Sequence, residues 1–191
     1  MSYQLQSSLF QPDNAFPEQE PNITYIPGFL NNQEFWFDQL RSTLIWNTRF
    51  KSRHTVTFGV TYNPGTGLKA VREMPEFLGP VCQQINDTFN YNPNNCLINH
   101  YPDGDHYISF HSDKDTEMKA QTGVTILSLG SIRTMALRNI NNPKLCFHYP
   151  LAPGSVFYMK DALQLEWQHG IAKEPESGPR ISLSFRSLIS D

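Results

Sequence analysis

Cysteine, charge and long apolar runs are all scarce in this chain of 191 residues. Its three cysteines, Cys82, Cys96 and Cys146, are an odd number without a C-x-x-C pair, so neither a disulfide framework nor a structural zinc site is indicated. No apolar run approaches the length of a membrane span, and Met1–Pro12 lacks the basic and apolar regions of a secretory signal. We therefore expect no membrane association and a reducing setting, either cytoplasmic or nuclear.

The composition is that of a folded domain. With 39% hydrophobic, 13% aromatic and 17% charged residues, the chain is too aromatic and too weakly charged for a disordered protein. Its length predicts one domain, large enough to bury a core and enclose a site. We expect residues 1–20, rich in Gln, Ser, Pro and Glu, to form a loosely ordered arm, and residues 21–191 to form that single domain, as a monomer.

The net charge of -3 conceals one basic segment. From Arg41 to Arg72 the chain has six Lys or Arg residues and no Asp or Glu, so this segment carries +6 and the remainder -9. A net acidic protein has no uniformly basic coat for nucleic acid, but a local patch can still bind phosphates.

Two helical segments are predicted before position 94. A short strand and turn over Ile23–Phe29 precede a helix that Asn31 or Asn32 caps, and apolar residues in Phe77–Phe89 recur at helical spacing. Both helices are expected to cover a sheet. The first would direct three apolar side chains toward a core, namely Phe35, Leu40 and Leu44.

After Asn94 apolar and polar residues alternate, which is the period of a β-strand. About eight short strands are predicted, separated by turns rich in Gly, Pro, Asn and Asp. They cover Cys96–Tyr101, Tyr107–Asp113, Thr122–Leu129, Thr134–Arg138, Lys144–His148, Ser155–Met159, Glu166–Ile171 and Arg180–Ile189. The expected fold is mainly β with flanking helices, a β-sandwich or jelly-roll barrel.

Polar residues recur at every second position in four of these strands, and residues at that spacing share a face. Ile108 and Phe110 are expected on the face opposite to His111. If the apolar faces meet a helix or a second sheet, the polar faces line the interior of a barrel and mark a site. These polar sets are His111 with Asp113, Asn99 with Tyr101, Trp167 with His169, and the series Arg180, Ser182, Ser184 and Arg186.

His111, Asp113 and His169 are the candidate metal ligands. Two imidazoles and one carboxylate on one face of an octahedral ion leave three positions open, the arrangement of non-haem Fe(II) oxygenases. A bidentate co-substrate and dioxygen can then bind the same iron, while an arginine deeper in the barrel binds a distal carboxylate in fork geometry.

Each of these residues has a structural alternative. A His-x-Asp pair occurs by chance in many proteins, and Arg180 and Arg186 could be charges that protect a strand edge from aggregation. The joint occurrence of His-x-Asp, a later His and a following Arg in separate strands favours the metal site. The remaining histidines are not part of such a pattern. They are interpreted as hydrogen-bonded within the protein or solvent-exposed, namely His54, His100, His106 and His148.

Three stretches of the chain resemble the AlkB-like 2-oxoglutarate- and Fe(II)-dependent dioxygenases, and the resemblance extends from about Ile23 to the end. Together the stretches are highly specific for that family. They are Asn99–Asp105 leading into His111–Asp115, then Leu127–Gly130 with Arg133, and finally Trp167–His169 followed by Pro179–Arg186.

The resemblance implies a double-stranded β-helix with His111, Asp113 and His169 as iron ligands. It further implies that the co-substrate 2-oxoglutarate is held by four residues, with Arg180 at the distal carboxylate, namely Asn99, Tyr101, Arg180 and Arg186. Where the family usually has Asn between the two arginines, this chain has Ser182. The serine hydroxyl is shorter but can still bond the co-substrate, directly or through water.

For the substrate, the resemblance implies N-alkylated bases of the 1-methyladenine and 3-methylcytosine type in single-stranded or duplex DNA or RNA. Fe(II), 2-oxoglutarate and dioxygen would demethylate them oxidatively, with succinate and formaldehyde as products. Asp115 matches an acidic position that relatives use to recognise the amino edge of the base. Its alternative is a solvated loop carboxylate.

The nucleotide-recognition lid of the family corresponds to residues within about 41–72, the basic segment found from the charge count. Phosphates bind clustered Lys and Arg, and a flipped base needs aromatic surfaces. Phe58 and Tyr62 are the candidate surfaces, with ordinary strand or core aromatics as the alternative. Arg53 is a candidate phosphate contact, with a solvated charge as the alternative.

Two other functions remain open on the sequence alone. An oxygenase of the same fold could act on a protein side chain or a small molecule, which the net negative charge favours. A catalytically silent binding module could keep the barrel for recognition, although the intact candidate ligands and both arginines weigh against it.

Overall fold

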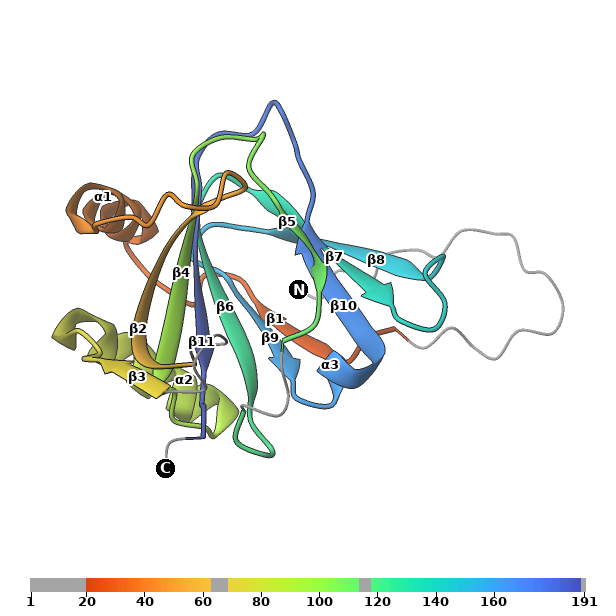
Figure 1. The fold of residues 1–191 in the computed structure, drawn as a ribbon, viewed down its shortest axis with the longest axis horizontal. Helices are drawn as coiled ribbons and strands as arrows, with labels where there is room; N and C mark the ends of the chain where they lie inside the picture. Colours follow the sequence, from red (N-terminus) through yellow and green to blue (C-terminus); the bar gives the residue numbers. More distant parts are fainter. Residues whose placement is uncertain (1–19, 63–68, 114–117, 190–191) are drawn as a thin grey trace, which may run out of the picture.

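The computed structural model describes residues 20–62, 69–113 and 118–189, which form eleven β-strands, three α-helices and one 3-10 helix (Figure 1). The expected N-terminal arm lies outside the described residues except for Glu20. The strands are β1 (Ile23–Ile26), β2 (His54–Tyr62), β3 (Lys69–Arg72), β4 (Asn95–Tyr101), β5 (Ile108–His111), β6 (Gly123–Gly130), β7 (Arg133–Asn139), β8 (Cys146–Leu151), β9 (Val156–Lys160), β10 (Trp167–Ile171) and β11 (Arg180–Arg186). The helices are α1 (Gln33–Thr43), η1 (Glu76–Leu78), α2 (Gly79–Phe89) and α3 (Leu163–Glu166). None of the helices in these ranges is long and apolar enough to cross a membrane.

Two antiparallel sheets face each other and enclose the interior of a barrel. The larger has the strand order β1-β9-β6-β11-β4-β2-β3, and the smaller has the order β5-β10-β7-β8. In Figure 1 the smaller sheet lies to the right of the larger one. The eight strands from β4 to β11 agree with the eight predicted after Asn94, so the predicted mainly β fold with flanking helices is confirmed.

Helices α1 and α2 cover the outer face of the larger sheet, on the left of Figure 1. Leu40 of α1 and Ile85 of α2 are buried there, because each helix presents one apolar stripe to the sheet. Alternate residues of β11 complete this core, namely Ile181, Leu183 and Phe185. The intervening polar residues of β11 therefore face the barrel interior, as the alternation predicts.

The start of α1 differs from the expectation in two respects. Phe35 is 63% exposed, so its predicted core position is wrong: the residues of α1 that pack against the core are its neighbours Trp36 and Phe37, together with Leu40. Asn32 does hold the N-cap position, but its backbone is left-handed with φ 54° and its side chain makes no capping hydrogen bond.

The barrel interior contains a second apolar cluster and a cavity of about 440 Å³. The cluster joins side chains of both sheets, among them Val124, Leu137 and Phe157. Trp167 belongs to this cluster and packs against Phe147, with ring centroids 5.7 Å apart. Trp167 is therefore a core residue, although it lies on the same strand face as His169.

A β-bulge in β5 changes which of its side chains face inward. His169 of β10 pairs with His111, but Ile171, two residues further on, pairs with Ile108, three residues back along β5. The extra residue brings Ile108 to the inner face beside His111, where it lines the cavity, so the predicted outward position of Ile108 is wrong. Gly170 lies at the bulge, and a Cβ there would be 3.0 Å from the Ile108 carbonyl oxygen.

Three loops meet at the upper end of the barrel in Figure 1. The N–H of Tyr107 donates to the carbonyl of Ser52 at 2.9 Å, and the N–H of Glu174 donates to the carbonyl of Gly104 at 2.8 Å. These bonds join the loops that precede β2, follow β4 and follow β10. Arg133, which is fully buried, reinforces them by donating to three backbone carbonyls, those of Asp103, His106 and Ala172.

Candidate active site

The cavity between the sheets is lined by all eight predicted iron and co-substrate residues, and by Arg53. Strand pairing explains how residues distant in sequence reach it. On the larger sheet, Arg180 lies opposite Tyr101, and Ser182 lies opposite Asn99. Directly opposed residues of an antiparallel pair share a face, so these four side chains enter the cavity from one wall.

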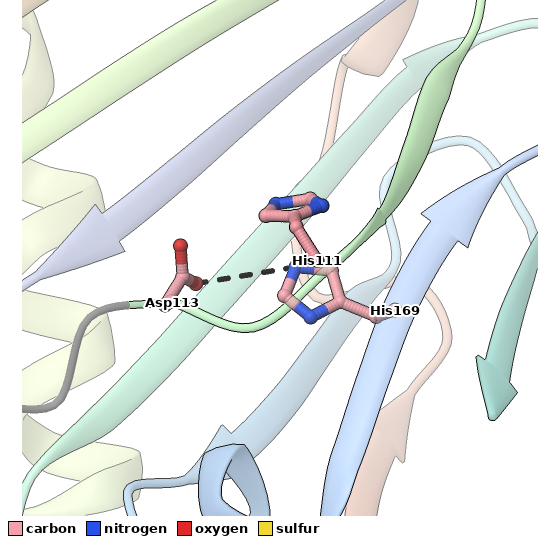
Figure 2. A group of neighbouring side chains, drawn as sticks. All are labelled: His111, Asp113 and His169. Atoms are coloured by element: carbon pink, nitrogen blue, oxygen red, sulfur yellow. Dashed lines mark ion pairs between the residues drawn. The ribbon is translucent and has the colours of Figure 1, made fainter. Parts of the chain in front are cut away.

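His111, Asp113 and His169 converge on the other wall (Figure 2). Their candidate ligand atoms all lie within 4.8 Å of one another, and Asp113 Oδ2 is 4.0 Å from His169 Nε2. The centroids of the two imidazole rings are 4.3 Å apart. Among the described residues, these three are the group of His, Cys, Asp and Glu side chains close enough to share a metal ion.

The protonation states suit metal coordination. His111 Nδ1 is 2.9 Å from the carbonyl oxygen of Ser109; because a carbonyl only accepts, Nδ1 is the donor of this bond and Nε2 is the nitrogen left for a metal. Burial lowers the pKa of His169 to about 4, so that imidazole is neutral at pH 7. Burial alone would raise the pKa of Asp113, but Arg186 and the two histidines together outweigh it and hold the pKa below its ordinary value.

One oxygen of Asp113 is paired and the other is not. Arg186 Nη2 donates to Asp113 Oδ1 at 2.8 Å, whereas Oδ2 is buried without a hydrogen-bond partner and faces His169. Buried polar atoms are seldom left without a partner, and a divalent cation would satisfy this one. Two imidazoles and one carboxylate oxygen are the donor set that non-haem Fe(II) uses. These residues therefore fit Fe(II).

Arg180 has the features of an anion-binding side chain. It is 1% exposed, its Nη2 donates to Ser128 Oγ at 2.9 Å, and its guanidinium carbon lies 5.2 Å from the centre of the Tyr101 ring. Its Nε and Nη1 have no hydrogen-bond partner among the described residues. Because an unpaired buried guanidinium is unfavourable, this fork fits a ligand carboxylate such as that of 2-oxoglutarate.

Two other arginines occupy positions that the sequence did not indicate. Arg186, a predicted co-substrate residue, contacts the candidate metal ligand Asp113. Arg53, a predicted phosphate contact, donates from Nε to Asn99 Oδ1 at 2.9 Å and lines the cavity. The structure thus places Arg53 beside the co-substrate residues and not on the outer surface.

Of the residues predicted to contact the base, the structure describes the side chain of Phe58, which does not line the cavity. Phe58 is 6% exposed and packs in the helix-covered core, with the Arg72 guanidinium 4.4 Å from its ring centre. Its predicted contact with a base is wrong, because it lies on the face of β2 that points away from the cavity. Tyr62 ends β2, but its side chain lies outside the described part of the structure, and so does Asp115.

Three buried side chains were missed or misread from the sequence, namely Gln164, Ser128 and His100. Gln164 accepts the backbone N–H of Asp113 across 51 residues, a contact that no local pattern signals. Ser128, which accepts from Arg180, follows the inward alternation of its strand and could have been found. His100 is buried with neither ring nitrogen hydrogen-bonded, and burial lowers its pKa to about 4, so its interpretation as satisfied or solvent-exposed is wrong.

Comparison with known proteins shows which family the chain belongs to. Residues 41–186 match the family described as the 2OG-Fe(II) oxygenase superfamily. The chain belongs to this superfamily. The oxygenase is 27% identical over 192 residues to alpha-ketoglutarate-dependent dioxygenase alkB homolog 3 of Mus musculus, covering 88% of this chain and 67% of that protein. It is 25% identical over 200 residues to DNA oxidative demethylase ALKBH2 of Homo sapiens, covering 98% and 73%.

The fold of the oxygenase is also that of OsALKBH1, with a TM-score of 0.69 at 16% identity, covering 88% of this chain and 99% of that one. The predicted AlkB-like family and the double-stranded β-helix fold are thereby confirmed. The chain is an Fe(II)- and 2-oxoglutarate-dependent dioxygenase with His111, Asp113 and His169 as the candidate facial triad. This sets aside the catalytically silent binding module.

Proposed function

We propose that this AlkB-like oxygenase removes alkyl groups from N-alkylated bases of the 1-methyladenine and 3-methylcytosine type in DNA or RNA. 2-Oxoglutarate is decarboxylated to succinate in the reaction, and a methyl carbon leaves as formaldehyde. One observation carries the proposal: the triad, a buried guanidinium with two unpaired nitrogens, and the loop of Ser52 and Arg53 with its exposed basic and aromatic residues all border one cavity. The name of the human relative, DNA oxidative demethylase ALKBH2, supports it.

One wall of the cavity would bind the metal, and the other would bind 2-oxoglutarate. His111, Asp113 and His169 would hold Fe(II), and the bound metal would supply the chemistry for hydroxylating the N-alkyl carbon, with dioxygen as the oxidant and 2-oxoglutarate as the co-substrate that is oxidised alongside it. Arg180 binds the distal carboxylate of 2-oxoglutarate, and the other polar residues of the same wall orient the rest of it, namely Asn99, Tyr101 and Ser182. Arg186 keeps Asp113 ionised, so one oxygen remains available to the metal.

The loop that borders the cavity through Ser52 and Arg53 has the chemistry that a nucleic acid requires. Phe50 is 52% exposed and lies between the exposed Arg49 and Lys51, in the loop whose Ser52 bonds Tyr107. Exposed cations bind phosphates, and aromatic rings stack on bases. Tyr107, 36% exposed and lining the cavity, takes the base-stacking role that the sequence assigned to Phe58.

Arg53 is the cationic residue that would contact the alkylated base. Its guanidinium reaches into the cavity and bonds Asn99, so it is within reach of a base whose alkyl carbon lies at the triad. A base of a duplex must leave the stack to enter this cavity, which costs a few kcal/mol and favours damaged pairs and single strands. Alkylated nucleic acid, single-stranded in preference to duplex, is therefore the proposed partner.

The test is mass spectrometry of a short single-stranded oligonucleotide that carries 1-methyladenine or 3-methylcytosine. The oligonucleotide is incubated with the protein, Fe(II), 2-oxoglutarate and ascorbate. Wild-type protein is expected to remove one methylene mass, whereas His111→Ala is expected to remove none. His148→Ala is the matched control, because His148 is an exposed histidine on β8 and its loss is expected to leave demethylation unchanged.

Succinate measured in the same samples separates the outcomes. Succinate without loss of mass from either oligonucleotide would refute the nucleic-acid substrate and leave the oxygenase assignment in place. An oxygenase acting on a protein side chain or a small molecule would then be the function to pursue. The overall negative charge is the observation that favours it.

A further inference from the structure

Asp113 is a metal ligand that the β-ladder does not position. β5 ends at His111, and the last ladder pair there is His111 with His169. Asp113 lies two residues beyond that pair. Its location in the cavity must therefore come from side-chain contacts, since no strand partner fixes its backbone.

Three hydrogen bonds tie this short segment to the barrel. Ser112 Oγ donates to the carbonyl of Trp167 at 3.1 Å, and Arg186 Nη2 donates to Asp113 Oδ1 at 2.8 Å. The third runs from the backbone N–H of Asp113 to Gln164 Oε1 at 2.9 Å. Of the three, the bond to Gln164 is the one that holds the main chain of the ligand itself.

Gln164 is placed for this contact by the one-turn helix α3, immediately before β10. Its side chain is buried, 3% exposed, and its Nε2 is directed at Met159 Sδ at 3.9 Å, a weak acceptor. Burying a carboxamide is unfavourable unless it is hydrogen-bonded. The bond to Asp113 is thus the strong interaction that the buried amide makes among the described residues.

We propose that Gln164 is a positioning residue for the metal centre. It fixes the main chain of Asp113 while Arg186 holds Oδ1, and together they direct Oδ2 toward His169. α3 and β10 follow each other in the chain, so Gln164 and His169 set two of the three ligands from one continuous segment. This role concerns the metal alone and holds whatever the organic substrate is.

Gln164→Met is the direct test, because methionine keeps the length and volume of glutamine but has no strong acceptor for the N–H. Binding of Co(II) to the full chain under nitrogen is followed through its visible absorption bands, which report ligand geometry independently of turnover. Loss of an outer-shell partner typically weakens metal binding about 10- to 100-fold. We expect a loss in that range, with altered absorption bands.

Gln84→Met is the matched control. Gln84 Nε2 donates to the carbonyl of Phe29 at 2.8 Å, so this change also removes a bond between a glutamine side chain and the backbone, but on the helix-covered side of the larger sheet. It is expected to lower thermal stability and to leave the affinity for Co(II) and the absorption bands as in the wild type.

A second variant keeps the proposal testable if Gln164→Met does not fold. Gln164→Asn keeps the amide but shortens the side chain by one methylene, which withdraws the acceptor from Asp113. We expect weaker Co(II) binding here as well. Wild-type affinity and wild-type absorption bands in a folded Gln164→Met or Gln164→Asn protein would overturn the proposal. Failure of every oligonucleotide assay would not affect it.

Discussion

Two fully buried arginines of the barrel differ in what their guanidinium groups contact. Arg133 donates to three backbone carbonyls and lies 3.7 Å from a carboxylate oxygen of Glu174. Arg180 donates to Ser128 and leaves two nitrogens without a partner. Arg133 Nε also lacks a hydrogen bond but lies near Glu174, so this cation is paired within the fold, whereas Arg180 lines the cavity and has two nitrogens open to a ligand.

Replacing Arg180 by Met is expected to raise the 2-oxoglutarate concentration needed for half-maximal succinate formation about 100-fold. A charge-assisted hydrogen bond contributes about 1.5–3 kcal/mol, and the fork is lost as a whole. Stability of the ligand-free protein should change little, because an unpaired buried charge is removed together with one bond. The measurement is succinate formation as a function of 2-oxoglutarate concentration.

Arg138→Met serves as the control for that measurement. Arg138 bonds Gln168 and stacks on Phe110 at 4.0 Å, and it does not line the cavity. The 2-oxoglutarate concentration needed for half-maximal succinate formation should be the same in Arg138→Met as in the wild type. An unchanged value in Arg180→Met would contradict the assignment of Arg180 to the distal carboxylate.

Residue type and spacing were enough to predict the triad. The side chains that contact it could not be predicted in this way, because they depend on the tertiary structure. His111, Asp113 and His169 could be singled out because His-x-Asp followed by His is a ligand set with known chemistry. Gln164 could not, since its partner is 51 residues away. Phe58 was misassigned because an aromatic residue in a strand has two possible faces, and only the position of the helices shows which face is covered.

At the scale of elements, the upper end of the barrel depends on contacts between loops. The loop after β4 and the loop after β10 are joined by the Gly104–Glu174 backbone bond and by Arg133, whose guanidinium bonds carbonyls in both. The loop after β4 borders the cavity through Tyr107, and the loop after β10 holds it in place. Their position therefore sets the shape of the rim.

Arg133→Met is expected to lower the free energy of unfolding by about 3 kcal/mol, because buried carbonyls and Glu174 lose their partner. Urea denaturation measures the change. Lys173→Met is the comparison: Lys173 forms an exposed ion pair with Asp105 at 3.8 Å, and exposed pairs contribute between 0 and about 1 kcal/mol. Equal losses in the two variants would show that Arg133 has no special structural role.

The elements themselves were largely predictable, and their irregularities were not. Alternation of apolar and polar residues located the strands from β4 onward. It could not reveal the bulge that turns Ile108 inward, because a bulge depends on the partner strand and on the close approach at Gly170.

For the whole molecule, metal and co-substrate binding should be linked to folding. The triad draws ligands from β5, from the segment after β5 and from β10, which come together only in the folded barrel. A ligand that binds only the folded chain adds about 2.7 kcal/mol when present at 100 times its dissociation constant. Mn(II), added with 2-oxoglutarate under nitrogen, is expected to stabilise the protein by that amount in a denaturant titration.

His111→Ala should lose the Mn(II)-dependent part of this stabilisation while it unfolds normally in the absence of metal. His148→Ala should retain it. The same stabilisation by Mn(II) in His111→Ala and wild type would place the metal somewhere other than at the triad.

The sequence by itself determined the strand periodicity, the division of β11 into an apolar and a polar face, and the identity of the three candidate ligands. These properties depend on residue type and on neighbours a few positions away. Only the tertiary structure decided that Arg53 bonds Asn99, that Phe58 is covered by helices and that Gln164 holds Asp113. Each of these contacts depends on strand register and sheet pairing, which join residues far apart in the chain and have no local signature.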